Sequence, residues 1–349
     1  MAKKVYNGET LKGKKRKKIR IFLTIILVIL ILLLLCFSGI SWYVYNKLSK
    51  VNYVKLENIE INEGVEEQLK GYRNIVLFGV DARANTYDNS RSDCIIIASI
   101  NEDTNEVKLT SIYRDTYVYI EGHGYDKITH AYAYGGPELA INTINKNFDL
   151  DITEFVAVNF DAVVDIIDAI DGVNITIESD ELNYINDYIS AVDSQMGKRT
   201  PKVTKTGNQT LSGVQALAYS RIRYTAGGDY KRTERMRDVL NASFNKAKTM
   251  SVGKLNNLAD ILLPKVCTNI TSNEILSMIP NITKYNVVSS IGWPYEVKGI
   301  TLDRWYGVPV TLESNVKKLH ADLFGNEGYE VSSKVKEYSN GIIKKTGYQ

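Results

Sequence analysis

Six basic side chains gather in residues 221–238, RIRYTAGGDYKRTERMRD, beside only three acidic ones. Guanidinium groups bind phosphate through paired hydrogen bonds, and pyrophosphate offers several such sites. Gly227 and Gly228 separate two predicted helices, so the chain can turn between the cations, and we expect Asp229 to cap the second helix. The segment is typical either of an anion site or of a solvated helix face with local ion pairs. Its cations are Arg221, Arg223, Lys231, Arg232, Arg235 and Arg237.

A second set of charged residues flanks the predicted strands 74–80, 94–100 and 107–112. Ligands of open α/β sheets bind where strands end, and Asp93 reaches that edge if the first two strands are antiparallel. Carboxylates beside arginines suit Mg²⁺, or Mn²⁺, sharing oxygens with a phosphate. The three histidines lack the paired spacing of a zinc site. The flanking residues are Asp81, Arg83, Arg91, Asp93 and Arg114.

A layered α/β domain has to position these residues. The strands NIVLFGV and CIIIASI are apolar on both faces, which indicates a sheet covered by helices on both sides. Helical patterns then alternate with strands as far as residue 250, which favours one α/β domain. The helix DAVVDIIDAID carries Val163, Ile166, Ile167 and Ile170 at helical spacing, and this apolar face either packs in the core or lines a pocket.

The N-terminal region predicts a membrane anchor. Residues 21–46 contain no charged side chain, and a membrane-spanning helix needs about 20 apolar residues. Residues 1–20 hold nine basic and one acidic side chain, which places that end in the cytoplasm. We therefore predict a cytoplasmic tail (1–20), a transmembrane helix (21–45), an extracellular spacer (46–72) and an extracellular domain (73–349).

Net charge argues against one class of function, nucleic-acid binding, and the cysteine positions allow at most one disulfide outside the predicted span. The residues after the basic tail carry 34 basic and 39 acidic side chains, so the net charge of −5 argues against nucleic-acid binding. Outside the predicted span only Cys94 and Cys267 could form a disulfide, and a buried thiol is the alternative for Cys94.

Several motifs of the sequence resemble those of the LytR-CpsA-Psr family of Gram-positive cell-envelope proteins. The resemblance covers about Asn74 to Leu240 and extends more weakly, through LPKVCTNIT and LHADLFG, to about residue 325. The matching motifs are NIVLFGVDAR, RSD before a strand, SIYRD, KITHAYAYGG, and TLSGVQALAYSRIR followed by GGDYKRTER.

The resemblance implies a three-layer α/β/α sandwich with an apolar pocket for a polyprenyl chain. It implies a Mg²⁺-dependent phosphotransferase that moves a polyprenyl-pyrophosphate-linked glycopolymer, of wall teichoic acid or capsular polysaccharide type, onto a hydroxyl of peptidoglycan. Asp81 and Asp93 match the family's Mg²⁺-associated residues, and we expect Asp93, Arg114 and Arg223 to be catalytic, with Asp93 the first candidate for the general base. The predicted pyrophosphate-binding residues are Arg83, Arg91, Arg114, Lys127, Arg221, Arg223, Arg232 and Arg235.

Two positions depart from the family pattern. Tyr113 stands where the family commonly has proline, and Met236 stands where it usually has a phosphate-facing glutamine. A thioether cannot donate a hydrogen bond, so Met236 removes a neutral contact worth about 0.5–1.5 kcal/mol. Two other functions remain open: a polyprenyl-pyrophosphate phosphatase that uses water as acceptor, and a non-catalytic binder of lipid-linked precursors.

Overall fold

The computed structural model describes residues 49–81, 87, 90–271, 274–275 and 282–349. The contacts of the chain separate Met1–Lys50 from a compact unit, Val51–Gln349. The predicted transmembrane helix and Arg83 lie outside the described residues. Within the described part of the chain, no helix combines the length and apolar character that a membrane crossing requires.

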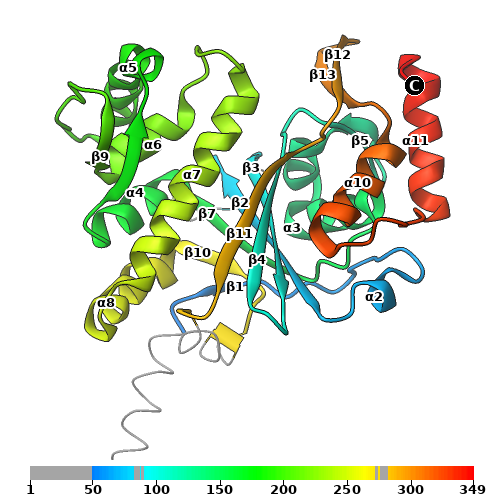
Figure 1. Ribbon diagram of the computed structural model, residues 1–349, viewed down its shortest axis with the longest axis horizontal. Coiled ribbons are helices and arrows are strands. Elements are labelled where there is room, and N and C mark those ends of the chain that lie inside the picture. The colour runs from blue at the N-terminus through cyan, green and yellow to red at the C-terminus, as the bar shows by residue number, and fades with distance from the viewer. Residues whose placement is uncertain (1–48, 82–86, 88–89, 272–273, 276–281) are drawn as a thin grey trace, which may run out of the picture. The chain divides into compact units, whose positions relative to one another are not determined.

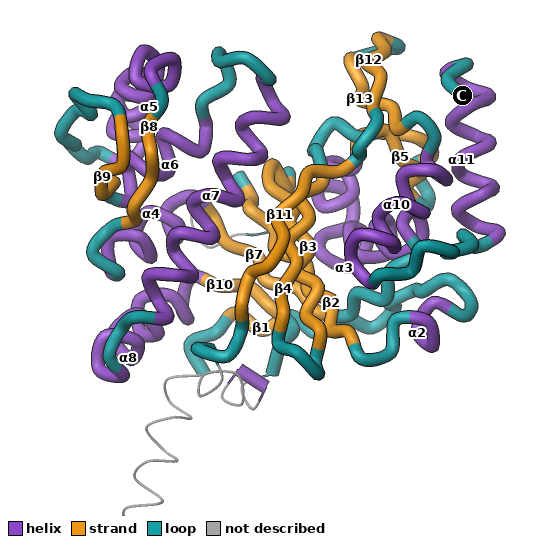
Figure 2. Tube along the Cα trace, in the orientation of Figure 1, coloured by secondary structure: helices purple, strands orange, loops and turns teal. Residues whose placement is uncertain are grey.

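A mixed seven-stranded sheet forms the centre of the folded unit (Figures 1 and 2). β3 pairs antiparallel with both β2 and β4, whereas β7 runs parallel to β2 and β11 runs parallel to β4. The order across the sheet is β1 (Asn52–Tyr53), β10 (Val266–Thr268), β7 (Glu154–Asn159), β2 (Tyr72–Val80), β3 (Ser92–Asn101), β4 (Glu106–Ile112) and β11 (Asn286–Trp293).

Helices cover both faces of this sheet, as the two-sided apolar strands predict; Figure 1 shows α3, α10 and α11 on one side and α4, α7 and α8 on the other. The mixed α/β class is therefore confirmed. The helices are α2 (Val65–Gln68), α3 (Ile128–Phe148), α4 (Phe160–Ala169), α5 (Ser179–Met196), α6 (Gly213–Arg221), α7 (Gly228–Lys248), α8 (Val252–Leu262), the short 3-10 helix η1 (Leu263–Lys265), α10 (Leu312–Phe324) and α11 (Ser333–Thr346).

Three two-stranded ribbons complete the unit. The VNITI strand is present but lies outside the central sheet, because it pairs with a strand that precedes α6. The ribbons are β5 (Tyr117–Ile120) with β6 (Gly124–Lys127), β8 (Val173–Ile177) with β9 (Gly207–Leu211), and β12 (Val297–Thr301) with β13 (Trp305–Pro309).

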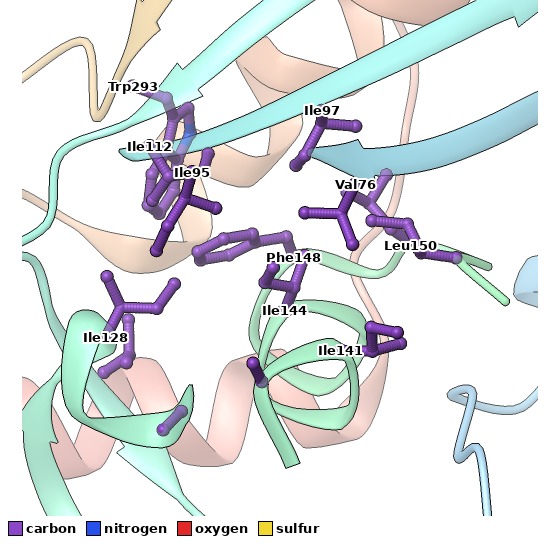
Figure 3. Close-up of a cluster of buried hydrophobic side chains, with 14 of the residues drawn as sticks. Val76, Ile95, Ile97, Ile112, Ile128, Ile141, Ile144, Phe148, Leu150 and Trp293 are labelled. Atoms are coloured by element: carbon purple, nitrogen blue, oxygen red, sulfur yellow. The ribbon is translucent and has the colours of Figure 1, made fainter. Parts of the chain in front are cut away.

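Alternate residues of the central strands enter different cores. Val76 and Ile97 pack with Phe148 of α3 in the largest core (Figure 3), whereas Ile75 and Ile96 pack on the opposite face. Each face of the sheet is therefore buried against its own layer of helices.

A separate core holds α4, α5, α6 and the β8–β9 ribbon together, with Val164, Ile185 and Leu217 fully or almost fully buried. α6 approaches α4 closely at Gly213, where an added Cβ would lie 2.2 Å from the carbonyl oxygen of Val164. This close contact fixes α6, and with it the arginines that follow, against α4.

The segment predicted as a spacer packs on the domain. Val65 and Leu69 are buried in the largest core, and Ile59 and Ile61 pack against it. Residues 51–71 therefore belong to the folded unit, because their sparse apolar residues find partners on elements distant in sequence.

Cys94 and Cys267 are not joined by a disulfide. Burial raises the pKa of the Cys94 thiol to about 12, which makes it an unreactive side chain.

Candidate functional site

The carboxyl ends of β2 and β4 and the beginning of β3 meet at one edge of the sheet, because both strands run antiparallel to β3. Asp81 follows β2 and its backbone N–H donates to the carbonyl of Arg91 at 3.2 Å. Asp93 lies near the start of β3, and Arg114 comes shortly after β4. The antiparallel pairing that brings Asp93 to this edge is therefore confirmed.

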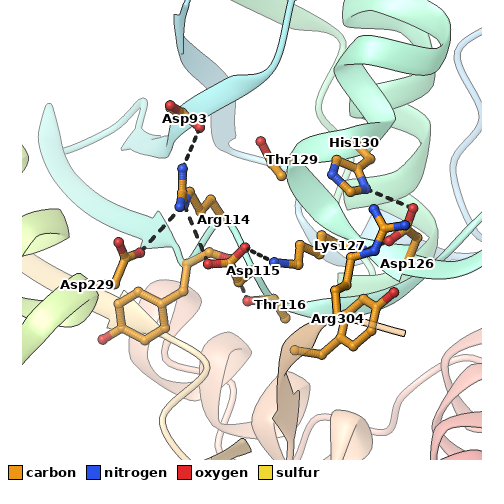
Figure 4. A network of polar contacts seen from close by, with 12 residues as sticks. Asp93, Arg114, Asp115, Thr116, Asp126, Lys127, Thr129, His130, Asp229 and Arg304 are labelled. Atoms are coloured by element: carbon orange, nitrogen blue, oxygen red, sulfur yellow. Dashed lines mark hydrogen bonds and ion pairs between the residues drawn. The ribbon is translucent and has the colours of Figure 1, made fainter. Parts of the chain in front are cut away.

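Arg114 joins three carboxylates at this edge (Figure 4). Its Nη1 lies 2.9 Å from Oδ1 of Asp93, and its Nε lies 3.5 Å from Asp115 and 4.0 Å from Asp229. Burial lowers the pKa of Arg114, but these carboxylates outweigh burial and raise it. Lys127 adds a second cation, with Nζ 2.7 Å from Oδ1 of Asp115.

Asp229 brings the arginine-rich segment to the same place. Its carboxylate lies 3.1 Å from Nη2 of Arg232 and 3.6 Å from Nε of Arg223, in addition to its contact with Arg114. Gly227, not Asp229, is the N-cap residue of α7, because its backbone adopts φ 88° and turns the chain one residue before the helix begins. The expected capping role of Asp229 is therefore wrong.

We call the seven residues joined by these contacts the charged cluster. Its three arginines share Asp229, and with Lys127 they outnumber the three carboxylates by one charge, so an incoming anion meets a small net positive charge. The cluster consists of Asp93, Arg114, Asp115, Lys127, Arg223, Asp229 and Arg232.

Arg232 has a buried donor that can accommodate a further hydrogen bond. Its side chain is 3% exposed, and its Nε is buried with no hydrogen-bond partner among the described residues. Burial lowers the pKa of Arg232 despite the opposing effect of Asp229. An anion bound beside Arg232 would relieve this cost, because a buried donor without a partner is expensive.

Arg221 and Arg91 lie outside the charged cluster. The Nη1 of Arg221 donates to Gln195 at 3.1 Å, and its guanidinium lies 5.3 Å from the ring centre of Phe160. The side chain of Arg91 is exposed next to Asp81. Arg83, the remaining predicted arginine of this edge, lies outside the described residues.

Arg235 differs from the other predicted ligands. It is fully buried, and its Nε lies 2.7 Å from Oε1 of Glu181 on α5. Its Nη1 donates to the carbonyl of Ile222 at 3.0 Å, and its Nη2 donates to the hydroxyl of Thr225 at 2.6 Å. The geometry therefore favours support of the 222–225 loop, which carries Arg223, over the predicted pyrophosphate contact.

An apolar pocket of about 290 Å³ opens among α4, α6, α7 and the central sheet. Val163, Ile166 and Ile167 line it as predicted, whereas Ile170 is buried in the core that holds α4, α5 and α6 together. Met236 also lines it, which places the thioether in an apolar wall. The other lining residues are Leu77, Phe78, Gly79, Cys94, Ile96, Val156, Val158, Phe160, Leu217, Ser220, Val239, Leu240, Ser243 and Leu262.

The pocket and the charged residues adjoin one another. Cys94 of the pocket wall follows Asp93, and Ser220 precedes Arg221. Phe160, another wall residue, carries the guanidinium of Arg221 above its ring. A ligand with an apolar chain and a phosphorylated head would fit across this junction.

Asp81 and Asp93 are the carboxylates at this sheet edge that could hold a magnesium ion jointly with a phosphate. Mg²⁺ usually takes one or two protein carboxylates and completes its shell with water and phosphate oxygens. Asp81 and Asp93 supply two carboxylates from adjacent strands, whereas no larger group of metal-ligating side chains occurs in the described part of the chain.

The sequence indicates one partner of the predicted residues and not another. Asp115 follows Arg114 directly in the SIYRD motif, so its place beside Arg114 is expected from the sequence. Glu181, the partner of Arg235, lies on a helix 54 positions away and has no local signal.

A model described as the LytR_cpsA_psr family matches residues 40–321. The chain is 30% identical over 302 residues to the polyisoprenyl-teichoic acid–peptidoglycan teichoic acid transferase TagT of Bacillus subtilis strain 168, covering 82% of this chain and 90% of TagT. It is 34% identical over 230 residues to the transferase TagU of Oceanobacillus iheyensis, covering 64% of this chain and 66% of TagU.

Solved structures give the same result. TagT bound to LIIa-WTA aligns with a TM-score of 0.58 and 27% identity, over 79% of this chain and 95% of that one. The family protein YwtF (TagT) with bound octaprenyl pyrophosphate lipid aligns with a TM-score of 0.54 and 26% identity, over 78% and 96%. The motifs, the fold and these matches agree, and the chain belongs to the LytR-CpsA-Psr family.

Proposed function

We propose that this protein transfers a polyprenyl-pyrophosphate-linked glycopolymer of the teichoic acid type onto a hydroxyl of peptidoglycan. The observation that carries the proposal is the junction between the apolar pocket and the charged residues, where Cys94 adjoins Asp93 and Arg221 covers Phe160. The names of TagT and TagU, and the lipid in the TagT structure, support the same reaction.

The reaction requires positioning and charge neutralisation more than covalent chemistry from the protein. Arg114, Arg223 and Arg232 would bind the pyrophosphate oxygens and neutralise the charge that develops on the departing polyprenyl phosphate. Asp229 holds these three arginines in place before the substrate arrives. Arg221, above the pocket residue Phe160, would lie where the pyrophosphate head group joins the polyprenyl chain.

Mg²⁺ is part of the proposal, with Mn²⁺ as an alternative. Asp81 and Asp93 would hold the ion, which would polarise a phosphoryl oxygen. The ion pair between Asp93 and Arg114 involves Oδ1, so the other carboxylate oxygen can face the metal.

The predicted transmembrane helix over residues 21–45 would place this domain outside the cell, beside the membrane that carries the lipid-linked donor. Such an anchor would keep the domain close to the membrane that holds the polyprenyl chain of the donor.

Transfer of labelled polymer from a polyprenyl-pyrophosphate donor to peptidoglycan, measured with the purified full-length protein, tests the proposal. We expect the change of Arg223 to Ala to lower the rate at least about 100-fold, since it removes a charge-stabilising donor. Lys231 to Ala is the matched control, because Lys231 pairs with Glu234 on α7 and does not join the charged cluster. The control should transfer at the wild-type rate.

The products separate the competing functions. Release of free sugar phosphate without attachment to peptidoglycan would make the protein a phosphatase. Binding of the donor with no turnover, with or without Mg²⁺, would make it a binder. A donor carrying a capsular polysaccharide, compared with a teichoic acid donor, determines which polymer is preferred.

A further inference from the structure

An Asp–His pair with a buried histidine lies beside the charged cluster and has no role in the function described above. His130, in the first turn of α3, places Nδ1 2.8 Å from Oδ2 of Asp126, at the end of β6. The His130 residue is 6% exposed. Figure 4 shows the pair on one side of Lys127 and the Asp93–Arg114 pair on the other.

The contacts of Asp126 determine which ring nitrogen is basic. Burial raises the pKa of Asp126, but hydrogen bonds from His130, from the Tyr134 hydroxyl at 2.8 Å and from the Lys127 backbone at 2.7 Å lower it on balance. An ionised carboxylate only accepts, so Nδ1 of His130 carries the hydrogen. The lone pair is therefore on Nε2, which accepts no hydrogen bond from any described residue.

The backbone next to His130 is fixed to the strands that carry the charged cluster. The backbone N–H of Thr129 donates to the carbonyl of Arg114 at 3.2 Å. The Thr129 hydroxyl donates to the carbonyl of Ser92, the residue before Asp93, at 2.9 Å. In Figure 4 the second ring nitrogen of His130 points away from Asp126, toward the side of Thr129 and Arg114.

Asp93, the sequence-based candidate for the general base, is already engaged. Its Oδ1 lies 2.9 Å from Nη1 of Arg114, and its other oxygen is the proposed metal ligand. A carboxylate that neutralises an arginine and a metal ion has little capacity left to accept a proton.

Resting on the proposed function, we propose that His130 is the general base of the transfer and that Asp126 orients and charge-balances it. The acceptor O–H gives its proton to Nε2 of His130 while its oxygen forms a bond to the sugar-linked phosphorus. The bond from that phosphorus to the bridging oxygen breaks, and its electron pair leaves with polyprenyl phosphate. Asp126 balances the imidazolium until the proton passes to water or to the leaving phosphate.

Other ionisable groups surround the pair. The ring centre of Tyr134 lies 5.8 Å from that of His130, and the ring of His123 stacks on Tyr134 at 4.1 Å. The hydrogen bond to Asp126 raises the pKa of Tyr134, so its phenol stays protonated. Arg91 and Arg304 place positive charge near Tyr134.

The transfer assay with full-length protein tests the proposal through His130→Gln, with His123→Gln as matched control. General-base catalysis is worth about 10²- to 10⁴-fold, so kcat of His130→Gln should fall by that factor while KM for the lipid donor changes little. The wild-type rate should fall on the acid side of its pH profile, and this decline should disappear in the variant. The control should keep the wild-type rate and profile.

Two further variants separate a chemical role from a structural one. His130→Gly should regain activity in proportion to added imidazole, which a purely structural site would not do. Asp126→Asn keeps the ring, so it should lower kcat and shift the acid side of the profile even if changes at His130 impair folding. Wild-type transfer by His130→Gln, or lost activity with an unchanged pH profile and no imidazole rescue, overturns the proposal and leaves the transferase function standing. Absence of transfer by the wild-type protein overturns the function itself.

Discussion

Arg232 and Arg235 lie three positions apart in the same helix and are almost equally buried, yet their surroundings give them different roles. Arg232 reaches Asp229 in the charged cluster and keeps an unpartnered Nε. Arg235 uses all three guanidinium nitrogens within the protein. The role of each arginine in this segment therefore depends on the carboxylate that it meets, Asp229 on the same helix for Arg232 and Glu181 on α5 for Arg235.

Breaking the buried Arg235–Glu181 pair should destabilise the protein. Glu181 to Gln leaves a buried guanidinium without its counter-charge, and removing one partner of such a pair costs about 3–5 kcal/mol. Urea unfolding of the variant and the wild type measures the loss in free energy of unfolding. Glu234 to Gln, which breaks the more exposed Lys231–Glu234 pair, is the control and should cost no more than about 0.5 kcal/mol. If Glu181 to Gln left the free energy of unfolding unchanged but abolished transfer, the predicted pyrophosphate-binding role of Arg235 would be favoured instead.

At the scale of elements, the sequence predicts what short-range patterns encode. The apolar runs 74–80, 94–100 and 107–112 correspond to β2, β3 and β4. Of the charged residues at their ends, Asp93 and Arg114 form an ion pair. The predicted helices after Ser212 and Gly227 are α6 and α7. These features depend on residues near one another in the chain, so periodicity and turn residues suffice.

Features that depend on distant partners were not predicted. β11 pairs parallel with β4, but only its last residue is buried, so its sequence lacks the apolar pattern of a central strand. Residues 51–71 look like a polar spacer until their few apolar side chains reach the core. One local feature was also not predicted: Asp126 and His130 are four positions apart, and their hydrogen bond forms because the chain passes from β6 into α3 between them.

The docking of α10 on α3 should make stability depend on pH. His320 is fully buried, and its Nε2 contacts the carbonyl oxygen of Phe148 at 3.0 Å. Burial lowers the pKa of His320, so on acidification the unfolded chain takes up a proton before the folded protein does. The contribution of His320 to the free energy of unfolding is therefore complete above the pKa of the unfolded chain, about 6.5, and declines as the pH falls below that value.

The midpoints of urea unfolding at pH 7.5 and pH 5.5 test whether stability falls on acidification. The wild type should lose more stability between the two values than His320→Gln, which can still donate to the carbonyl but does not titrate. His123→Gln changes an unburied histidine and should keep the wild-type pH dependence. Equal losses in wild type and His320→Gln would assign the acid sensitivity to other groups.

At the scale of the whole molecule, the proposed function assigns the pocket and the charged cluster to two parts of one ligand. Met236 belongs to the pocket wall, although its neighbours Arg235 and Arg237 are cations on the same helix. A glutamine there would bring an amide into an apolar wall, which costs free energy without a hydrogen-bond partner. Met236 therefore favours the chain of the lipid rather than its phosphates.

Ligand-induced thermal stabilisation of the full-length protein separates the two contributions. A long-chain polyprenyl diphosphate should raise Tm more than geranyl diphosphate or a long-chain prenol at equal concentration, because only it fills both regions; saturation at 100 times Kd is worth about 2.7 kcal/mol. Met236→Gln should reduce the advantage of the long chain and keep the preference for diphosphate over prenol, whereas Met236→Leu should match the wild type. Arg223→Ala should reduce the preference for diphosphate over prenol and keep the advantage of the long chain, because Arg223 belongs to the charged cluster and does not line the pocket. If both variants weakened the binding of all three ligands by the same factor, the pocket and the charged cluster would not bind separate parts of one molecule.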